Sequence, residues 1–394
     1  MCNRIIRLAG LVCLTTAIAA GAAENAASSV SPEAAMRPTI TVDATAPRVL
    51  VSRELYGIFF EEVTHAGLLL GSVCSAHAAG LESPAVGTLE GELRIHDPST
   101  IVRCSSHYWV FGTGWGIRSR FSSDLSRWQA GPAVFSSPPD WTSNTVKGNH
   151  GYFWAPDVVQ IQGRYLLYYS VSTWGSRDSA IGLATASAPA PGSTNLDWQD
   201  RGLVLRSTAQ DEFNAIDPSA LLDASGRLWL AFGSYWSGIK LIELDPVTGL
   251  RLARDSPIYS LAWNESIEAA CLYQHGDFFY LLVNWGQCCR GTNSTYQIRV
   301  GRSPAATGPF LDRAGADLMQ RGGSLLLGTD GPRIGPGHAG ILKEGDRCWL
   351  SYHYYDANEH GIAKLGLVPL TWSADGWPDL AASRHGSGIP KQGH

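Results

Sequence analysis

One short segment occurs five times along this 394-residue chain: a polar turn that leads into an aromatic-rich run. The copies start about 50 to 70 residues apart, the range in which β-propeller blades are sought. Each copy follows a short apolar segment through a tight turn, which is typical of a β-hairpin. Convincing helical periodicity is absent between the copies, and Pro, Gly and Ser are frequent there. The copies are SSHYWVFGTG (105–114), GRYLLYYSVS (163–172), GRLWLAFGSY (226–235), GDFFYLLVNWG (276–286) and GDRCWLSYHYY (345–355).

The repeat predicts an all-β fold, a five-bladed β-propeller over residues 88–380. Five four-stranded units that close into a ring leave no long sheet edge exposed. A hydrophobic content of 44% with only 16% charged residues is enough for a large core, and 43 glycines fit a turn-rich β protein. The net charge of −5 gives no electrostatic reason to expect nucleic acid or an anionic membrane as a partner. We expect a monomer.

The first residues carry the pattern of a secretory signal. Two arginines precede an apolar run over residues 8–20 that is too short to span a membrane, and small residues follow it. We therefore expect a signal peptide over residues 1–23 and a secreted protein, extracellular or periplasmic. Residues 24–87 are expected to form an N-terminal extension and linker, and residues 381–394 a C-terminal tail.

Six cysteines remain once the expected signal is removed. Export permits disulfides, yet a domain of this size does not need them, and the sequence predicts no particular pairing. The adjacent pair Cys288–Cys289 is unlike a zinc-binding spacing, so we assign no metal to it. The six are Cys74, Cys104, Cys271, Cys288, Cys289 and Cys348.

An ionisable residue stands shortly ahead of every aromatic-rich copy. Two of these residues open the sequence Asp-Pro-Ser, although Asp and Pro are both depleted in strands. A single aspartate in such a turn usually caps backbone N–H groups. Five blades with an ionisable residue at the same phase favour a different interpretation, in which these side chains mark the start of the innermost strands and converge on the central channel. They are Asp97, Asp157, Asp217, Glu268 and His338.

Crowded carboxylates of this kind suit the hydrolysis of a sugar acetal. One carboxyl group donates a proton to the leaving oxygen, a second handles water, and a third can hold the pKa of the acid up by like-charge repulsion. The sequence contains no GxSxG, HExxH or P-loop for other chemistries. Three tryptophans near predicted rims could stack on sugar faces, although a tryptophan is more often part of a core. They are Trp115, Trp154 and Trp174.

Several motifs together resemble the arabinanases of glycoside hydrolase family 43. The likeness runs from about Leu93 to Leu380, most of the mature chain, and the motifs keep their order and spacing. It implies a five-bladed propeller that hydrolyses α-1,5-linked L-arabinan in endo fashion, with inversion at the anomeric carbon. The motifs are RIHDPST, GYFWAPDV, YSVSTWGSRDSAIG, NAIDPS, SIEAACLY, VNWGQCCRGTNSTY, GGSLLLG, GPGHAG and DGWP.

The same resemblance implies roles for individual residues. Asp97 matches the general base that activates water, and Glu268 the general acid. Asp217 matches the carboxylate that raises the pKa of the acid and orients it. Inversion predicts that the carboxyl groups of Asp97 and Glu268 lie roughly 6.5–9.5 Å apart. The positions that match substrate contacts are His96, Trp154, Trp174 and Asn214.

His338 matches a residue that points toward an axial ion, usually calcium, ligated largely by water. Calcium prefers oxygen ligands, so a hydrogen-bonding histidine without a metal stays open as an alternative. Asp157 is expected to be structural. Many relatives have Glu-Ala-Pro at the acid, whereas this chain has Ala270 in place of the proline, a change that loosens the backbone and that we expect to leave activity intact.

Residues 38–67 resemble the opening strand of family 51 α-L-arabinofuranosidases, but the barrel that should follow is missing. Glu61 and Glu62 look like a catalytic pair. Adjacent residues on a strand point to opposite faces, so a remnant of a domain fusion is the better interpretation.

Two other functions stay open from the sequence. One is an exo-acting α-L-arabinofuranosidase or β-xylosidase on the same fold, because sequence does not show which loops block an end of the cleft. The other is a carbohydrate-binding propeller without catalysis. The presence of Asp97, Asp217 and Glu268 together argues against it, since stacking on sugars needs no acid.

Overall fold

The computed structural model describes residues 88–187 and 196–380. The expected signal peptide, N-terminal extension and C-terminal tail lie outside the described residues, as do Cys74, the family 51-like stretch and the pair Glu61 and Glu62. The boundaries of these segments therefore stay predictions. Among the residues that the structure describes, we find no helix with the length and hydropathy of a membrane span.

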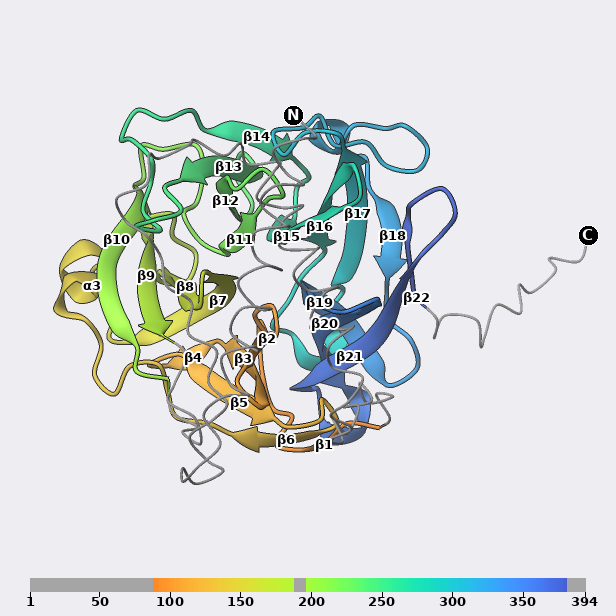
Figure 1. Ribbon diagram of the computed structural model, residues 1–394, viewed down its shortest axis with the longest axis horizontal. Coiled ribbons are helices and arrows are strands. Elements are labelled where there is room, and N and C mark those ends of the chain that lie inside the picture. Colours follow the sequence, from red (N-terminus) through yellow and green to blue (C-terminus); the bar gives the residue numbers. More distant parts are fainter. Residues whose placement is uncertain (1–87, 188–195, 381–394) are drawn as a thin grey trace, which may run out of the picture. The chain divides into compact units, whose positions relative to one another are not determined.

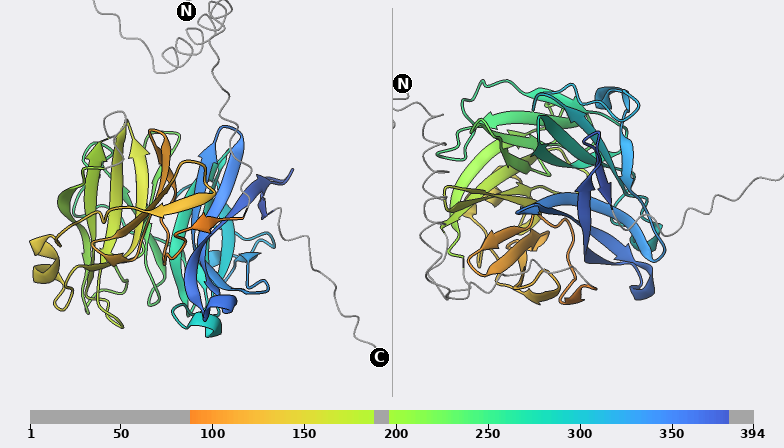
Figure 2. Two further views of the ribbon diagram at one scale, coloured as in Figure 1. Left: turned by 90° about the horizontal axis from the view of Figure 1, so that it is seen from below. Right: turned by 45° about the vertical axis from the view of Figure 1, so that its right-hand side comes forward.

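The described residues form five β-sheets arranged around a central axis, which confirms the five-bladed propeller (Figure 1). In side view the strands run along that axis (Figure 2). The first two sheets have five strands each. Blade 1 contains β2 Val102–Cys104, β3 His107–Gly112, β5 Arg118–Ser122, β6 Arg127–Ala130 and β1 Glu90–Gly91, and blade 2 contains β4 Gly114–Trp115, β7 Tyr152–Ile161, β8 Arg164–Val171, β9 Ser179–Ser187 and β10 Gln199–Ser207.

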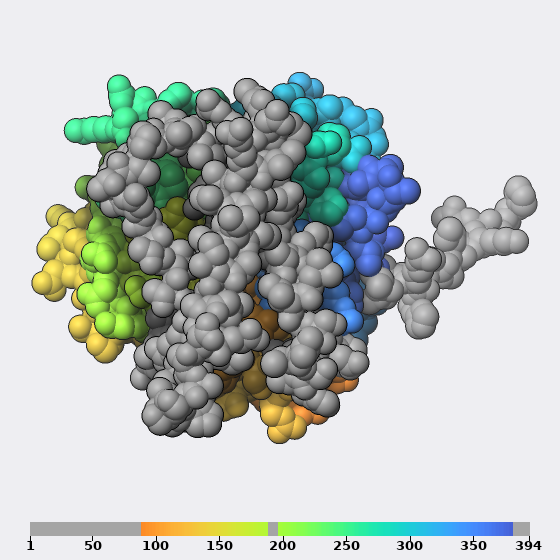
Figure 3. All heavy atoms as spheres, in the orientation of Figure 1, coloured from red at the N-terminus to blue at the C-terminus, as the bar shows by residue number. Residues whose placement is uncertain are grey.

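The other three sheets have four strands each, in sequence order from the axis outward. The blades follow one another around the ring, from orange through yellow and green to blue in the space-filling view (Figure 3). Blade 3 contains β11 Ser219–Leu222, β12 Leu228–Phe232, β13 Ile239–Leu244 and β14 Tyr259–Ala262; blade 4 contains β15 Ile267–His275, β16 Phe278–Trp285, β17 Gln297–Ser303 and β18 Ser324–Leu327; blade 5 contains β19 Arg333–Glu344, β20 Arg347–Asp356, β21 Ile362–Trp372 and β22 Pro378–Leu380.

Short helices occur only in connections of the described chain. The single α-helix among them, α3, precedes the inner strand of blade 2, and the others are 3-10 turns. They are α3 Asp140–Thr145, η3 Gly291–Asn293, η4 Leu318–Gln320 and η5 Ala357–Glu359.

The five aromatic-rich copies form the second strand of every blade, and each pairs in antiparallel fashion with the inner strand before it, as predicted. A blade between two others buries both faces of its sheet, so these strands are apolar at consecutive positions. All five residues of β12 are buried, for example. The copies correspond to β3, β8, β12, β16 and β20.

The ring is closed between the first and the last blade. The Ile95 N–H donates to the Ala363 carbonyl at 3.2 Å, and the Leu365 N–H donates to the Leu93 carbonyl at 2.8 Å. The chain ahead of β2 therefore pairs with β21 of blade 5, and these hydrogen bonds hold blades 1 and 5 together.

Asp157 ties three blades together near the axis. Its carboxylate accepts the Thr100 N–H of blade 1 and the Ala220 N–H of blade 3, each at 2.9 Å. In the same way the Leu272 N–H of blade 4 donates to the Ser219 hydroxyl of blade 3 at 3.1 Å. Because a buried backbone N–H without a partner is costly, these contacts support the structural role expected for Asp157.

Candidate active site

The inner end of each blade has the same backbone irregularity. A non-glycine residue there has a positive φ, a conformation that L-residues rarely adopt. In blades 2, 4 and 5 it coincides with a register shift between the inner and second strands, as in a β-bulge. The residues are Asp97 (φ 49°), Ala155 (40°), Asp217 (55°), Ala269 (54°) and His338 (57°).

This register corrects one expectation from the sequence. Asp97, Asp217 and His338 do share the left-handed position, but Glu268 stands one residue before it and Asp157 two residues after it. Side chains alternate along a strand and a bulge interrupts the alternation, so a fixed distance in sequence does not fix a direction. The carboxylate of Asp157 is engaged with neighbouring blades, as described above, and three carboxylates rather than four form the site.

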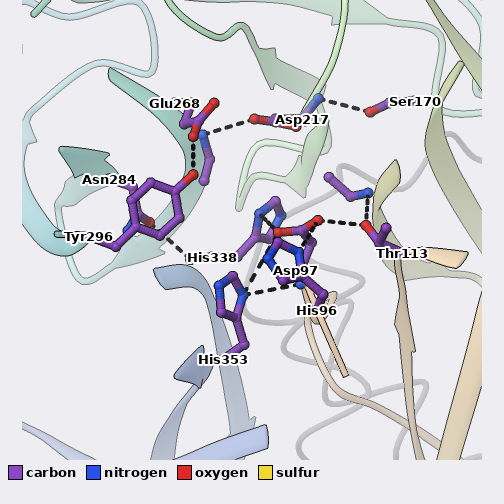
Figure 4. Close-up of polar contacts among 12 residues, drawn as sticks. His96, Asp97, Thr113, Ser170, Asp217, Glu268, Asn284, Tyr296, His338 and His353 are labelled. Atoms are coloured by element: carbon purple, nitrogen blue, oxygen red, sulfur yellow. Dashed lines mark hydrogen bonds and ion pairs between the residues drawn. The ribbon is translucent and has the colours of Figure 1, made fainter. Parts of the chain in front are cut away.

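Asp97 is surrounded by hydrogen-bond donors and imidazoles (Figure 4). The Thr113 hydroxyl donates to Asp97 Oδ2 at 2.5 Å, and His96 Nδ1 lies 2.8 Å from the same oxygen. Asp97 Oδ1 faces His338 Nδ1 at 3.5 Å. Burial alone would raise the pKa of Asp97, but the charge and hydrogen bond of His96, with the other imidazoles, hold that pKa well below its usual range. Asp97 is therefore ionised.

His96 is the cationic partner of Asp97. Burial alone would lower the pKa of His96, but the charge of Asp97 and the hydrogen bond to it raise that pKa to about 10. The second ring nitrogen, Nε2, lies 2.8 Å from the Tyr355 hydroxyl and 3.7 Å from Cys289 Sγ. A hydrogen bond with Cys288 and the nearby His96 lower the pKa of Cys289 to about 5. A network of polar side chains thus fixes the orientation of the imidazole.

His353 completes this wall of the site. Its ring stacks on His96 with centroids 4.2 Å apart, and its Nδ1 accepts the Asp97 backbone N–H at 3.1 Å. Burial lowers the pKa of His353 well below its usual range, so the ring is neutral. With Nδ1 as acceptor, Nε2 carries the proton, and this group has no partner among the described residues.

Glu268 lies in a different environment. The Ser234 hydroxyl donates to Glu268 Oε2 at 2.7 Å, and the Tyr296 hydroxyl donates to Oε1. Burial raises the pKa of Glu268; the two hydroxyl hydrogen bonds oppose this shift and the negative charge of Asp97 adds to it. Glu268 therefore retains its proton to higher pH than an ordinary glutamate.

Asp217 is coupled to Glu268 through charge and backbone. Burial, followed by the charges of Glu268 and Asp97, raises the pKa of Asp217 well above its usual value. Two buried carboxyl groups this close resist ionising together, so the pair holds a proton. Asp217 Oδ2 also accepts the backbone N–H of Ala269 at 3.2 Å (Figure 4). Asp217 is itself anchored by its own N–H, which donates to the Ser170 hydroxyl at 2.9 Å.

His338 is buried at the same inner position of blade 5. Its backbone N–H donates to Asn284 Oδ1 at 2.9 Å, and burial lowers the pKa of its imidazole, which is therefore neutral. Three side chains in the neighbourhood, His96, Asp97 and His353, bring possible metal-ligating atoms within 4.8 Å of one another. Two imidazoles and one carboxylate are more typical of transition-metal ligands than of calcium ligands. A calcium ion would need water for most of its ligands.

The other expected substrate contacts lie on blade 2 and at the entrance to blade 3. The Trp174 side chain is 80% exposed and meets Trp154 edge to face, with ring centroids 6.4 Å apart. Asn214 is buried, and its amide donates only a long hydrogen bond, 3.5 Å, to the Ser176 carbonyl. Within the described ranges Asn214 Oδ1 has no donor, which leaves an acceptor available for a ligand hydroxyl.

Sequence reasoning missed most of the groups that hold these side chains. His353 and Tyr355 alternate on β20 and so face the same side, a signal that the aromatic-rich copy SYHYY already contained. Tyr296 lies in the quoted motif NSTY, but nothing in that motif indicates a contact with Glu268. The cysteines from 104 to 348 are free thiols, and the pair Cys288–Cys289 carries no disulfide.

Residues 91–378 match the model for glycosyl hydrolases family 43. Extracellular endo-alpha-(1->5)-L-arabinanase 1 of Bacillus subtilis is 40% identical over 321 residues, which cover 79% of this chain and 94% of that protein. Extracellular exo-alpha-(1->5)-L-arabinofuranosidase ArbA of Cellvibrio japonicus is 35% identical over 326 residues, covering 79% and 90%. Among solved structures, the endo-arabinanase of Bacillus licheniformis superposes with a TM-score of 0.69 at 40% identity, covering 74% of this chain and 99% of that one.

Proposed function

This chain belongs to glycosyl hydrolase family 43 and is a glycoside hydrolase, and on that basis we propose that it cleaves α-1,5-linked L-arabinan internally, with inversion. The observation that carries the proposal is the contrasting environment of two carboxyl groups at one site. Imidazoles hold the pKa of Asp97 well below its usual range, whereas burial raises the pKa of Glu268. An inverting glycosidase needs one carboxylate base and one carboxylic acid.

Asp97 acts as the general base. Its Oδ2 is occupied by Thr113 and His96, so Oδ1, whose nearest imidazole nitrogens lie 3.5 and 3.8 Å away, is the oxygen that takes a proton from water. As that proton leaves, the water oxygen attacks the anomeric carbon from the face opposite the leaving group. The ion pair with His96 fixes the carboxylate during this step.

Glu268 acts as the general acid and gives its proton to the departing glycosidic oxygen. Asp217 and Glu268 together hold a proton before the reaction, because two neighbouring buried carboxyl groups resist ionising together. The carboxyl groups of Asp97 and Glu268 are predicted to lie roughly 6.5–9.5 Å apart, which leaves room for the water.

Three groups position the sugar. The exposed face of Trp174, next to Trp154, offers a stacking surface, and the unpartnered Asn214 Oδ1 accepts a hydroxyl of the ring. His96, held between Asp97 and Tyr355, donates to the sugar at the water-attacked face when the substrate displaces the Tyr355 hydroxyl from Nε2.

For the axial ion, the proposal remains one calcium at His338, ligated largely by water. The neutral imidazole of His338 has a lone pair to offer, and the ionised Asp97 supplies the neighbouring negative charge. Such an ion would stabilise the negative charge of Asp97 near the propeller axis. Metal analysis of the purified protein before and after chelation, read out by bound calcium per chain and by thermal stability, tests this assignment.

The second candidate is an exo-acting enzyme on the same fold, which is favoured by the 35% identity to the relative named as an exo-α-(1→5)-L-arabinofuranosidase. A β-xylosidase and a non-catalytic propeller have no comparable support. Because both relatives described above are named extracellular, we also propose that this chain is secreted, and we propose that it acts as a monomer.

Product analysis on linear arabinan separates the candidates, with Glu268→Ala as the control. A spread of oligomers that disappears in Glu268→Ala supports the endo enzyme. Single arabinose or one fixed short product means an exo enzyme. If the unmutated protein bound arabinan without hydrolysing it, both the endo- and the exo-acting candidates would be contradicted.

A further inference from the structure

An open cavity of about 480 Å³ lies where connections of blades 2, 3 and 4 meet. It belongs to none of the contacts used above for catalysis. The side chains that line it include Arg177, Glu212, Trp236, Ser237, Lys240 and Trp263.

Two residues that line the cavity lie close in sequence to proposed sugar contacts. Arg177 follows Trp174 by three residues in the connection between β8 and β9. Glu212 precedes Asn214 by two residues in the segment that leads into β11. Both proposed sugar contacts therefore stand on segments that also line the cavity.

The acid side of the site is connected to the cavity in the same way. Ser234, which donates to Glu268, is followed two residues later by Trp236. Trp263 lies five residues before Glu268 in the connection that leads into β15. The indole N–H of Trp263 donates to the Trp236 carbonyl at 3.0 Å, so the two tryptophan segments are joined.

Trp236 presents an aromatic surface in a fixed position. Its side chain is 40% exposed, and the Arg177 guanidinium lies 5.8 Å from the ring centroid. Tyr235 and Trp236 have φ values of 53° and 39° in succession, a strained conformation for two non-glycine residues. Strain of this kind persists where the surrounding structure holds it and is concentrated at binding sites.

Both cations that line the cavity are engaged within the protein, which favours a neutral ligand. The Arg177 guanidinium donates to the Ala209 carbonyl at 2.7 Å. The Lys240 ammonium donates to the Ser237 carbonyl at 2.9 Å and to the Ser260 hydroxyl at 2.8 Å, and the charge of Glu212 acts on it. This cation is therefore not free to bind an anion. Ser237 Oγ, in contrast, is buried without a partner in the part of the chain that the structure describes.

We propose that this cavity binds a more distant part of the same neutral arabinan chain that occupies the candidate active site. An arabinofuranosyl ring stacks on Trp236, and a sugar hydroxyl bonds with Ser237 Oγ. The inference rests on the proposed function and adds to it a binding site remote from the cleaved bond, which holds long chains and does not contact short ones.

The test compares substrate lengths in Trp236→Ala. This change removes the ring but keeps the backbone carbonyl that Trp263 uses. We expect kcat/KM for arabinohexaose and linear arabinan to fall about tenfold, the cost of one lost stacking contact, while kcat/KM for arabinobiose and arabinotriose is unchanged. Trp236→Phe should restore most of the loss. Leu252→Ala removes an exposed apolar side chain that does not line the cavity and serves as the matched control.

Calorimetry with the inactive Glu268→Gln protein separates this inference from the proposed function. If the unmutated chain hydrolyses no arabinan, but Glu268→Gln binds arabinohexaose about tenfold more weakly once Trp236→Ala is added, the cavity inference stands and the proposed function fails. If Trp236→Ala lowered kcat/KM equally for substrates of all lengths, or for none of them, the inference would be overturned. Tighter binding of polygalacturonate than of arabinohexaose would also overturn it, because the ligand would then be an acidic glycan.

Discussion

Asp217 holds the backbone that carries Glu268: its Oδ2 accepts the N–H of Ala269, the next residue, at 3.2 Å. Ala269 has a φ of 54°, so this hydrogen bond stabilises the bulge that sets the direction of the Glu268 side chain. The same carboxyl group interacts electrostatically with Glu268. Asp217 thus controls both the orientation and the protonation of the proposed acid.

The first prediction separates these two effects. Asp217→Asn retains an oxygen that can accept the Ala269 N–H but removes the charge, whereas Asp217→Ala removes both. We expect Asp217→Asn to lower kcat/KM on arabinan about 100-fold, within the range for lost acid catalysis, and Asp217→Ala to lower it further. Steady-state kinetics on both variants checks this. Full activity in Asp217→Asn would show that the charge of Asp217 is not needed for catalysis.

The second prediction concerns pH. The Tyr296 hydroxyl donates to the Glu268 carboxylate and so favours its ionised form, against burial, which raises the pKa of Glu268. Tyr296→Phe should raise that pKa further, and the acid should then stay protonated to higher pH. We therefore expect the alkaline limb of the kcat/KM profile to move to higher pH.

The matched control for this prediction is Tyr259→Phe, which removes a hydroxyl from a partly buried tyrosine of blade 3. Ser234→Ala should shift the limb in the same direction as Tyr296→Phe, since Ser234 also donates to Glu268. An alkaline limb that moves to lower pH in Tyr296→Phe would contradict the assignment of Glu268 as the acid.

The third prediction uses two buried asparagines. Asn214 has an unpartnered Oδ1, whereas Asn149 accepts the Gly151 N–H at 3.0 Å and donates to the Tyr152 carbonyl at 3.1 Å. Asn214→Ala should therefore weaken transition-state binding by about 1–3 kcal/mol with little loss of stability, while Asn149→Ala should lower Tm by several degrees. Kinetics and thermal unfolding of both variants measure this. A stability loss in Asn214→Ala equal to that in Asn149→Ala would mean that Asn214 is structural.

The fourth prediction concerns the axis. Asp157→Ala leaves two buried backbone N–H groups, those of Thr100 and Ala220, without an acceptor. We expect the free energy of unfolding to fall by about 2–4 kcal/mol, while the activity of the folded fraction is retained. Urea unfolding, with the exposed Asp255→Ala as control, measures the change. A complete loss of activity in a stable Asp157→Ala protein would instead place Asp157 in the catalytic machinery.

The sequence was sufficient for the fold because the second strand of each blade is buried on both faces. Such strands need apolar and aromatic residues at consecutive positions, and β12 and β20 show how visible this pattern is. The same pattern located the inner strands, because each is joined to its second strand by a tight turn.

Direction and pairing were harder to predict. The bulge at Ala269 offsets Glu268 from the position of Asp97 and Asp217, and no residue in the sequence SIEAACLY marks that offset. The contact of Tyr296 with Glu268 lies within blade 4 and that of Thr113 with Asp97 within blade 1, each between residues that meet only when the strands of that blade pair. These partners therefore depend on the strand pairing within a blade, which local sequence patterns do not encode.

The most direct test of the roles proposed for Asp97 and Glu268 is the stereochemistry of the first product, followed by proton NMR during hydrolysis of an α-1,5-linked arabino-oligosaccharide. If Asp97 activates water and Glu268 protonates the leaving oxygen, a single displacement must invert the anomeric carbon. We expect the β-anomer to appear first and the α-anomer later, by mutarotation. The α-anomer as the first product would mean that a carboxylate attacks the sugar directly, and would contradict Asp97 as a general base.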